Sequence, residues 1–254
     1  PGRSVHAWEA AVLFVSVLLA SSSAGAFNQY FETDLDSRMR RTRKRPFVTG
    51  TFAHSNWWLV PIVLLLVIGV GAAALLLNNM AGLYVFLGAF FYAVVYTIWL
   101  KRRTWLNIVI GGAAGSFAVL AGAAVVDPQL GPVPILLAIV LFLWTPPHFW
   151  SLAIAQRDEY AAAGVPMLPV VVGDQSAANA VVWNTIALVV CSILPFFFGL
   201  GWLYLMGALA GGAFFIYRSL QLAGNPCRKT AMNSFFASLI QLVVLLVFAV
   251  LDVI

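Results

Sequence analysis

Charge is scarce in this sequence, because Asp, Glu, Lys and Arg together make up only 9% of its 254 residues. A soluble domain carries about 25% charged residues. The chain is instead 62% hydrophobic, with a mean hydropathy of +0.95. This composition excludes an ordinary soluble protein and predicts an integral membrane protein surrounded by membrane lipid.

Cysteine is scarce as well. The two cysteines, Cys191 and Cys227, lie in an apolar run and in a loop, so we expect no structural disulfide. The net charge of +5 comes from basic loops, which ordinarily lie beside anionic lipid headgroups. The positive charge therefore requires no nucleic acid, and we predict no nucleic acid partner.

Long hydrophobic runs are abundant, and they determine the expected fold. A membrane-spanning helix needs roughly 17 to 25 mostly apolar residues. The sequence therefore predicts an all-α fold, a polytopic membrane helical bundle of about eight transmembrane helices that forms a single domain over residues 1–254. The expected spans are residues 8–27, 57–77, 80–100, 105–126, 133–153, 178–198, 200–217 and 231–252. Pro195 and the glycines of residues 199–201 predict a tight turn between the sixth and seventh spans.

The distribution of basic residues predicts the orientation of the bundle. Lys and Arg concentrate in the short cytoplasmic loops of membrane proteins. With eight spans, every one of the 14 Lys and Arg residues except Arg3 falls on the same side, which we expect to be cytoplasmic. An alternative treats residues 8–26 as a cleaved signal peptide, but Glu9 interrupts the apolar segment that such a peptide needs.

Acidic residues gather after the first span, in "NQYFETDLDSRMRRTRKRP" (residues 28–46). Asn28, Glu32 and Asp36 are spaced four apart, so an α-helix with about 100° per residue would place them within an arc of roughly 80°. Asp34 lies away from that arc and would join it only if the helix unwinds. Six basic residues follow, and carboxylates holding Mg²⁺ beside Arg and Lys suit a bound diphosphate. The alternative is a solvated polar loop with its own ion pairs.

A second charged cluster lies in "WTPPHFWSLAIAQRDEYAAAGVPMLPVV" (residues 144–171). It places Asp158 and Glu159 at the same end of the bundle, where two acidic edges can converge on one diphosphate. Prolines in this stretch favour a broken helix at Pro146 and Pro147 and a loop of fixed shape after the span.

These two stretches, together with "YTIWLKRRTWLNIVIGGAAG" (residues 96–115), resemble the protoheme IX farnesyltransferase (haem O synthase) family of UbiA-type intramembrane prenyltransferases. The resemblance covers residues 28–171. It implies nine spans, the first of which is expected to be missing from an N-terminally truncated chain, around a central cavity open to the cytoplasmic side. It also implies the bacterial cytoplasmic membrane, or the mitochondrial inner membrane, as the location.

The resemblance further implies the reaction and its partners. Farnesyl diphosphate would alkylate a vinyl group of protohaem IX (haem B) with addition of water, giving haem O, with Mg²⁺ as cofactor and haem A synthase as a suggested protein partner. Two alternatives stay open: prenyl transfer to an aromatic quinone precursor or a chlorin, and an ion-coupled transporter. An ion-coupled transporter would have acidic residues at the middle of the membrane, whereas the two acidic clusters of this sequence lie at the membrane edge.

The resemblance, together with the charge and polarity of single residues, suggests the site residues; the alternative is that the basic residues only set the topology and that Tyr96 is an ordinary interface anchor. The catalytic group would be Asn28, Glu32, Asp36 and Lys101; the metal ligands would be Glu32, Asp34, Asp36, Asp158 and Glu159; and the substrate-binding residues would be Arg41, Arg45, Arg102, Arg103, Tyr96, Asn107, His148 and Tyr160. Glu32 and Glu159 stand where the family typically has Asp, which changes the position of the ligand oxygens.

Histidine within a span is unusual. His148 lies between Pro147 and Phe149 in an apolar run, and a polar side chain in lipid must find a partner. It is a candidate ligand of haem iron or of another substrate atom. The alternative is a packed histidine that is hydrogen-bonded to a neighbouring helix.

Small-residue runs complete the pattern. "GGAAG" (residues 111–115) and "GALAGG" (residues 207–212) predict close approach of helices rather than a phosphate-binding loop.

Overall fold

The computed structural model describes residues 4–253, all of whose regular elements are helices. Within these residues, eight helical segments are long and apolar enough to cross a membrane. They run over Ala7–Phe31, Asn56–Leu76, Asn79–Leu100, Asn107–Val126, Pro132–Ala155, Asp174–Phe198, Trp202–Gly224 and Arg228–Leu251. The eight predicted spans are therefore confirmed, and their ends differ from these by at most seven residues. Arg3 lies outside the described residues.

Several spans contain more than one element. The first is α1 (Ala7–Phe31), and the second joins η1 (Asn56–Trp58) to α4 (Leu59–Leu76). The third joins α5 (Asn79–Phe90) to a π-helical segment, η2 (Phe91–Leu100), and the fourth joins α6 (Asn107–Gly111) to α7 (Ala113–Val126). The last four are α8 (Pro132–Ala155), α11 (Asp174–Ile193) with η3 (Leu194–Phe198), α12 (Trp202–Gly224) and α13 (Arg228–Leu251).

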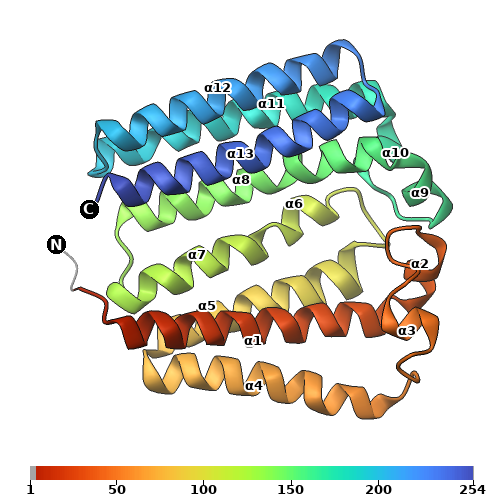
Figure 1. The fold of residues 1–254 in the computed structure, drawn as a ribbon, viewed down its shortest axis with the longest axis horizontal. Coiled ribbons are helices and arrows are strands. Elements are labelled where there is room, and N and C mark those ends of the chain that lie inside the picture. Colours follow the sequence, from red (N-terminus) through yellow and green to blue (C-terminus); the bar gives the residue numbers. More distant parts are fainter. Residues whose placement is uncertain (1–3, 254) are drawn as a thin grey trace.

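The spans form two groups that run side by side (Figure 1). One group contains α1, α4 and α5, and the other contains α8, α11, α12 and α13. The α6–α7 segment lies between the two groups and contacts α5 and α8. Four short helices cover one end of the bundle: α2 (Thr33–Arg38), α3 (Pro46–Thr49), α9 (Arg157–Ala162) and α10 (Leu168–Val172).

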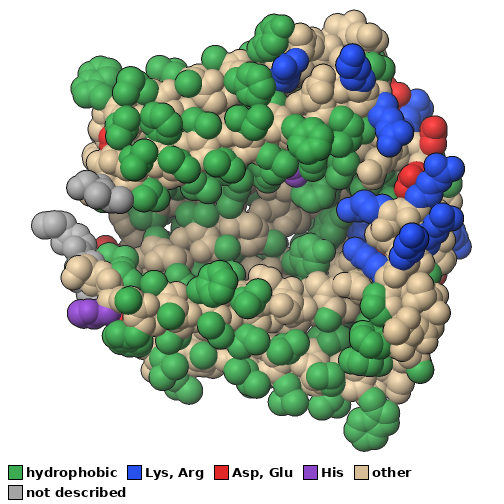
Figure 2. Space-filling view, in the orientation of Figure 1, with side chains coloured by type: hydrophobic (Ala, Val, Ile, Leu, Met, Phe, Trp, Pro, Cys, Tyr) green, Lys and Arg blue, Asp and Glu red, His purple; other side chains and the backbone are tan. Residues whose placement is uncertain are grey.

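The basic side chains gather at the end with the short helices, whereas the acids Glu9, Asp127 and Asp252 lie at the opposite end. Figure 2 shows the blue side chains at the end with the short helices, with red ones among them, while hydrophobic side chains cover the flanks of the bundle. Leu75 is 86% exposed and Trp183 is 71% exposed, values that are costly in water but favourable against lipid. The buried positions are largely small, since Ala73, Ala121 and Ala208 are fully buried between helices. Small buried residues and large outward ones are typical of helix packing in a membrane.

The predicted small-residue contacts are present. A Cβ added at Gly111 would lie 2.8 Å from Cδ2 of Tyr96, and one added at Gly112 would lie 2.9 Å from Cβ of Thr145. A Cβ at Gly212 would lie 2.7 Å from Val189. These separations are shorter than real Cβ contacts allow, so only glycine permits these helices to approach so closely.

The turn between the sixth and seventh spans is also as predicted. Pro195 lies in η3. Gly199, after the end of η3, has a φ of +120°, a backbone conformation that residues other than glycine rarely adopt. The Asp252 carboxylate at the end of α13 accepts hydrogen bonds from the backbone N–H groups of Gly201 and Tyr204, at the start of α12. The turn is therefore tied to the last helix of the bundle.

The expected helix break at Pro146 and Pro147 is wrong. Both prolines lie inside α8, which continues from Pro132 to Ala155. Neighbouring hydroxyl groups bond to the backbone around them: Ser151 Oγ donates to the carbonyl of Pro147 at 2.7 Å. The Trp144 indole also donates to the carbonyl of Ser238 on α13, at 2.8 Å. Packing and side-chain hydrogen bonds thus preserve a helix that local sequence preference would interrupt.

Candidate active site

The first acidic cluster forms where α1 meets α2. Glu32 is the residue between the two helices; its backbone N–H donates to the carbonyl of Asn28 at 2.9 Å, and its side chain is fully buried. Asn28 Nδ2 donates to Glu32 Oε2 at 2.7 Å and to Thr97 Oγ1 at 3.1 Å. Asp36, on α2, is 3% exposed. The helix changes direction at Glu32, and the side chains spaced four apart still come together.

Two cations neutralise these two buried acids. Arg45 Nη1 donates to Asp36 Oδ2 at 2.7 Å and to Asn28 Oδ1 at 3.4 Å. Lys101, directly after η2, donates its ammonium group to Glu32 Oε2. A buried carboxylate is costly unless it is paired and hydrogen-bonded, and both acids meet that condition. Glu32 Oε1, however, has no hydrogen-bond partner and is buried.

Asp34 lies apart from this cluster. Both of its carboxylate oxygens accept hydrogen bonds from Arg102, at 2.7 and 2.9 Å, and its side chain is 51% exposed. The hydrogen bond from Arg102 lowers the pKa of Asp34 below its ordinary value of 3.8. The sequence interpretation required the helix to unwind before Asp34 could join Glu32 and Asp36. The helix does break at Glu32, but Asp34 turns toward Arg102 on the outer surface.

A central cavity of about 320 Å³ lies beside the cluster, at the charged end of the bundle. Its lining combines the predicted polar residues with aromatic side chains and small residues. The predicted residues that line it are Asn28, Asp36, Arg41, Arg45, Tyr96, Lys101 and Tyr160. The sequence did not single out Tyr92, Trp144, Thr145 or Phe149, which also line it. Glu32 does not line this cavity, but it is hydrogen-bonded to Asn28 and Lys101, which do.

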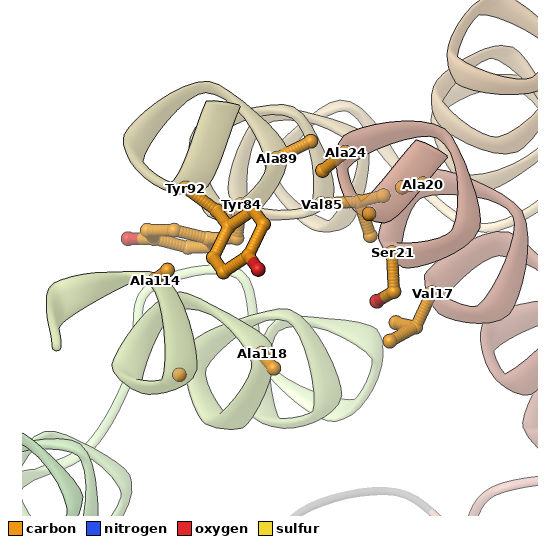
Figure 3. A pocket seen from close by; sticks show the side chains of 13 residues that line it. Val17, Ala20, Ser21, Ala24, Tyr84, Val85, Ala89, Tyr92, Ala114 and Ala118 are labelled. Atoms are coloured by element: carbon orange, nitrogen blue, oxygen red, sulfur yellow. The ribbon is translucent and has the colours of Figure 1, made fainter. Parts of the chain in front are cut away.

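A second, apolar cavity of about 380 Å³ extends from the first along the membrane helices. The two cavities share Tyr92, Ala114 and Gly115. Figure 3 shows the apolar cavity with α1 on one side, α5 on another and α7 on the third, and with small side chains over most of its wall. A polar chamber joined to an apolar one suits an amphipathic ligand.

The second acidic cluster lines a different, more open cavity of about 850 Å³. Arg157, Asp158 and Glu159 contribute to its surface, and Arg41 lines both this cavity and the central one. Glu159 Oε2 is buried without a hydrogen-bond partner. The structure therefore brings the two acidic edges to the same end of the bundle, with Arg41 between them, but not into one cavity.

Tyr160 connects these regions. It follows Glu159 on α9, lies almost fully buried, and lines the central cavity. Burial raises the pKa of its phenol above the ordinary value of 10. Tyr160 therefore stays protonated at neutral pH and can donate a hydrogen bond to an anion.

The remaining predicted residues differ in their placement. Asn107 is buried and donates through Nδ2 to the carbonyl of Lys101 at 3.3 Å, so it holds the turn after η2 rather than lining the cavity. Arg102 pairs with Asp34, and Arg103 is exposed; neither lines the central cavity.

His148 is packed between helices. Its Nδ1 lies 2.7 Å from Ser238 Oγ on α13, and its ring stacks on Trp144 and Phe235 at centroid distances of 4.2 and 4.4 Å. His148 does not line the central cavity, although Trp144 and Phe149 do. This arrangement favours the packed, hydrogen-bonded histidine over the iron ligand.

Thr97 and the π-helical geometry of η2 were not anticipated from the sequence. Thr97 is fully buried, and its hydroxyl donates to the carbonyl of Tyr92 at 2.8 Å, one residue further back than an α-helix would place the acceptor. The Lys101 backbone N–H bonds to Tyr96 with the same five-residue offset. Turns of π-helical geometry within α-helices are frequent at functional sites. A buried threonine five residues after a tyrosine is the only sequence signal, and it is weak.

Among residues 4–253, no group of three or more His, Cys, Asp or Glu side chains is arranged to hold a metal ion. The first cluster nonetheless presents hard oxygen donors: the amide of Asn28, the carboxylate of Asp36 and the unpartnered Oε1 of Glu32. Mg²⁺ is commonly held by one or two carboxylates plus the oxygens of a substrate phosphate. The donor set therefore fits Mg²⁺ brought together with a diphosphate.

Comparison with known proteins bears on the whole chain. Residues 1–240 match the UbiA prenyltransferase family. The chain is 59% identical over 232 residues to protoheme IX farnesyltransferase 2 of Paramagnetospirillum magneticum, covering 91% of this chain and 81% of that protein. It is 45% identical over 237 residues to protoheme IX farnesyltransferase 1 of the same organism, covering 93% of this chain and 83% of that protein.

Solved structures share the fold. The structure of a digeranylgeranylglyceryl phosphate synthase aligns with a TM-score of 0.79 at 22% identity, over 97% of this chain and 86% of that one. A UbiA homolog from Archaeoglobus fulgidus, bound to DMAPP and Mg²⁺, aligns with a TM-score of 0.70 at 16% identity, over 96% and 90% of the two chains.

Proposed function

Because the chain belongs to the UbiA prenyltransferase family, we propose that it transfers the farnesyl group of farnesyl diphosphate to a vinyl group of protohaem IX, with addition of water, to give haem O and diphosphate. The choice of haem as acceptor rests on the 59% identity to a protein named protoheme IX farnesyltransferase 2. The rest of the proposal is supported by the site itself.

One observation carries the prenyl-transfer chemistry. A cluster of buried acids and basic side chains borders a central cavity that continues into an apolar one between α1, α5 and α7. The polar part suits the diphosphate, and the apolar part suits the isoprenoid chain. Tyr92, Ala114 and Gly115, which line both cavities, lie where the allylic carbon would pass from one to the other.

The leaving diphosphate gains charge as its bond to the allylic carbon breaks. Arg41, Arg45 and Lys101 line the central cavity and can donate charge-assisted hydrogen bonds to phosphate oxygens. Mg²⁺ held by Asn28, Glu32 and Asp36 would supply further neutralisation of that leaving group. Asp158 and Glu159 line the neighbouring cavity, which shares Arg41 with the central one, and they would contribute metal ligands at the outer side of the diphosphate.

The allylic cation that remains must be protected until the vinyl group attacks it. The aromatic side chains of Tyr92, Tyr96, Trp144 and Phe149 line the central cavity. Aromatic rings can stabilise a cation and exclude bulk water. The vinyl carbon then forms the new carbon–carbon bond, and one water adds to the resulting haem-derived cation and loses a proton. The aromatic wall offers the haem macrocycle an apolar contact surface.

Sidedness and protein partners belong to the same proposal. The basic loops at the charged end support a cytoplasmic or matrix orientation of the site, in the bacterial cytoplasmic membrane or the mitochondrial inner membrane. Haem A synthase, which would consume haem O, stays a predicted partner.

The decisive experiment uses the purified protein in detergent or nanodiscs. It is incubated with haem B, farnesyl diphosphate and Mg²⁺, and the products are identified by mass. We expect haem O, and we expect chelation of the divalent cation to abolish its formation. Prenylation of an aromatic acceptor with no reaction of haem would instead select the quinone-precursor alternative. The absence of any prenyl transfer, in a protein that retains its fold, would contradict the proposal.

A further inference from the structure

The apolar cavity has a definite deep end. An α-helix rises about 1.5 Å per residue, so Tyr84 lies about 12 Å farther from the charged end than Tyr92. Val17 on α1 lies in the same way about 16 Å beyond Asn28. Among the residues that line the cavity, Val17 is the deepest on α1 and Tyr84 the deepest on α5.

Tyr84 lies between this cavity and a packed hydrophobic cluster. On one side it lines the cavity together with Val85 and Ala118. On the other side its ring packs against a buried cluster made of Ala81, Ala124 and Val125, which Leu13, Leu77 and Leu130 complete. Its ring also stacks on Phe117 at a centroid distance of 6.3 Å. Space therefore continues on the near side of Tyr84 and is filled on the far side.

The rest of the wall is made of small residues. Ala20, Ala24, Gly88, Ala89 and Ala114 leave the middle of the cavity wide. Tyr92 is the other large ring, but it lies at the junction with the central cavity, where an isoprenoid chain of any length would pass it. The length of the isoprenoid chain therefore matters only at the deep end of the cavity, where a chain with one additional isoprene unit would no longer fit.

We infer that Tyr84 is a specificity-determining residue that sets the longest isoprenoid chain this protein accepts. The inference rests on the proposed function, because it requires a prenyl diphosphate whose chain occupies the apolar cavity. A longer chain must either displace the Tyr84 ring from packed neighbours or fold back within the cavity. Overfilling a packed apolar site is unfavourable, and apolar pockets discriminate single methylene differences by roughly 10- to 200-fold.

The test is a competition between two donors. Wild type, Tyr84→Ala and Tyr84→Phe are given haem B with equal amounts of farnesyl and geranylgeranyl diphosphate, and the two prenylated haems are quantified by mass. We expect Tyr84→Ala to raise the geranylgeranyl-to-farnesyl product ratio at least about tenfold, and Tyr84→Phe to leave it at the wild-type value. Tyr217→Ala is the matched control, because Tyr217 is 54% exposed on α12, away from the cavity.

The outcomes separate the two claims. Farnesylated haem with an unchanged product ratio in Tyr84→Ala overturns the role of Tyr84 and leaves the proposed function intact. No prenylated haem from wild type with either donor overturns both. If Tyr84→Ala no longer unfolds cooperatively on heating, Tyr84→Leu is used in its place. The leucine side chain preserves more of the packing and, being smaller than tyrosine, still extends the cavity. An unchanged ratio in Tyr84→Leu also counts against the inference.

Discussion

Arg45 Nη1 lies 2.7 Å from Asp36 Oδ2, and the same nitrogen lies 3.4 Å from Asn28 Oδ1. The guanidinium thus joins the two polar groups on either side of Glu32. Arg45, Asp36 and Asn28 all line the central cavity, whereas Glu32 does not. This contact holds together the oxygens of α1 and α2 that we propose as metal ligands.

Asp36→Asn is expected to lower the rate of haem O formation by at least about 100-fold, because it removes a charge that orients the cation and the diphosphate in the transition state. Binding of haem B, measured by its absorption spectrum, should stay close to wild type. Asp34→Asn is the matched control, because Asp34 lies on the outer surface bound to Arg102. Equal loss of activity in both variants would contradict the separation of these two acids.

Lys101→Met should destabilise the protein, because it leaves the fully buried carboxylate of Glu32 without its cation. Breaking one side of a buried ion pair costs about 3 to 5 kcal/mol. The double variant Lys101→Met with Glu32→Gln should recover most of the loss in thermal stability while staying inactive. Recovery of activity along with stability would show that the pair has only a structural role.

The Asp34–Arg102 pair gives a pH dependence of known sign. The pKa of Asp34 in the folded protein lies below 3.8, so the pair contributes stability above that pH and loses it as the pH falls through the lower, folded value. Because the pair is largely exposed, its contribution is at most about 1 kcal/mol. Wild type should exceed Asp34→Asn in unfolding temperature by a small, constant amount from pH 5 to 8, and the difference should shrink in stronger acid. A difference that grows in acid would have the wrong sign.

Gly111→Ala tests the close approach of α6 to η2. The added methyl group would lie 2.8 Å from the Tyr96 ring, which must move into the central cavity or away from it. Overpacking of this kind costs about 1 to 3 kcal/mol, and we expect lower stability together with a raised KM for the prenyl donor. Gly71→Ala is the control: no atom lies within 4 Å of the added carbon, so it should be neutral or slightly stabilising. Similar behaviour of both variants would remove the packing argument.

His148→Leu is expected to leave the absorption spectrum of bound haem unchanged, because the imidazole is hydrogen-bonded to Ser238 and stacked between two aromatic rings. Thermal stability should fall by about 1 to 3 kcal/mol, since Ser238 loses a buried partner. Ser238→Ala should lower stability to a similar degree, again without a spectral change. A shifted haem spectrum in His148→Leu alone would restore the iron-ligand hypothesis.

Several features of this site could be predicted from local sequence. The four-residue spacing brought Asn28, Glu32 and Asp36 together, as helix periodicity requires, and it kept Asp34 apart even though the helix breaks at Glu32. The apolar runs identified all eight spans because lipid imposes a minimum helix length.

Other features depend on contacts between distant segments. Glu32 and Lys101 are 69 positions apart, and nothing in the spacing of either stretch assigns that cation to that acid. The π-helical turns that place Thr97 beside Asn28 leave little trace in composition. The continuous helix through Pro146 and Pro147 could not be predicted, because its packing against α13, which includes the hydrogen bond from Trp144 to Ser238, depends on a distant segment that local preference does not include.

Tyr84 and Tyr92 both lie on the third span, a continuous helical segment from Asn79 to Leu100 that ends directly before Lys101. The separation between the charged end and the deep barrier is consequently built into a single element. Tilting of the two helix groups against each other, or a bilayer of different thickness, would leave that separation unaltered. The longest isoprenoid chain that the protein accepts should therefore be the same in membranes of very different lipid content.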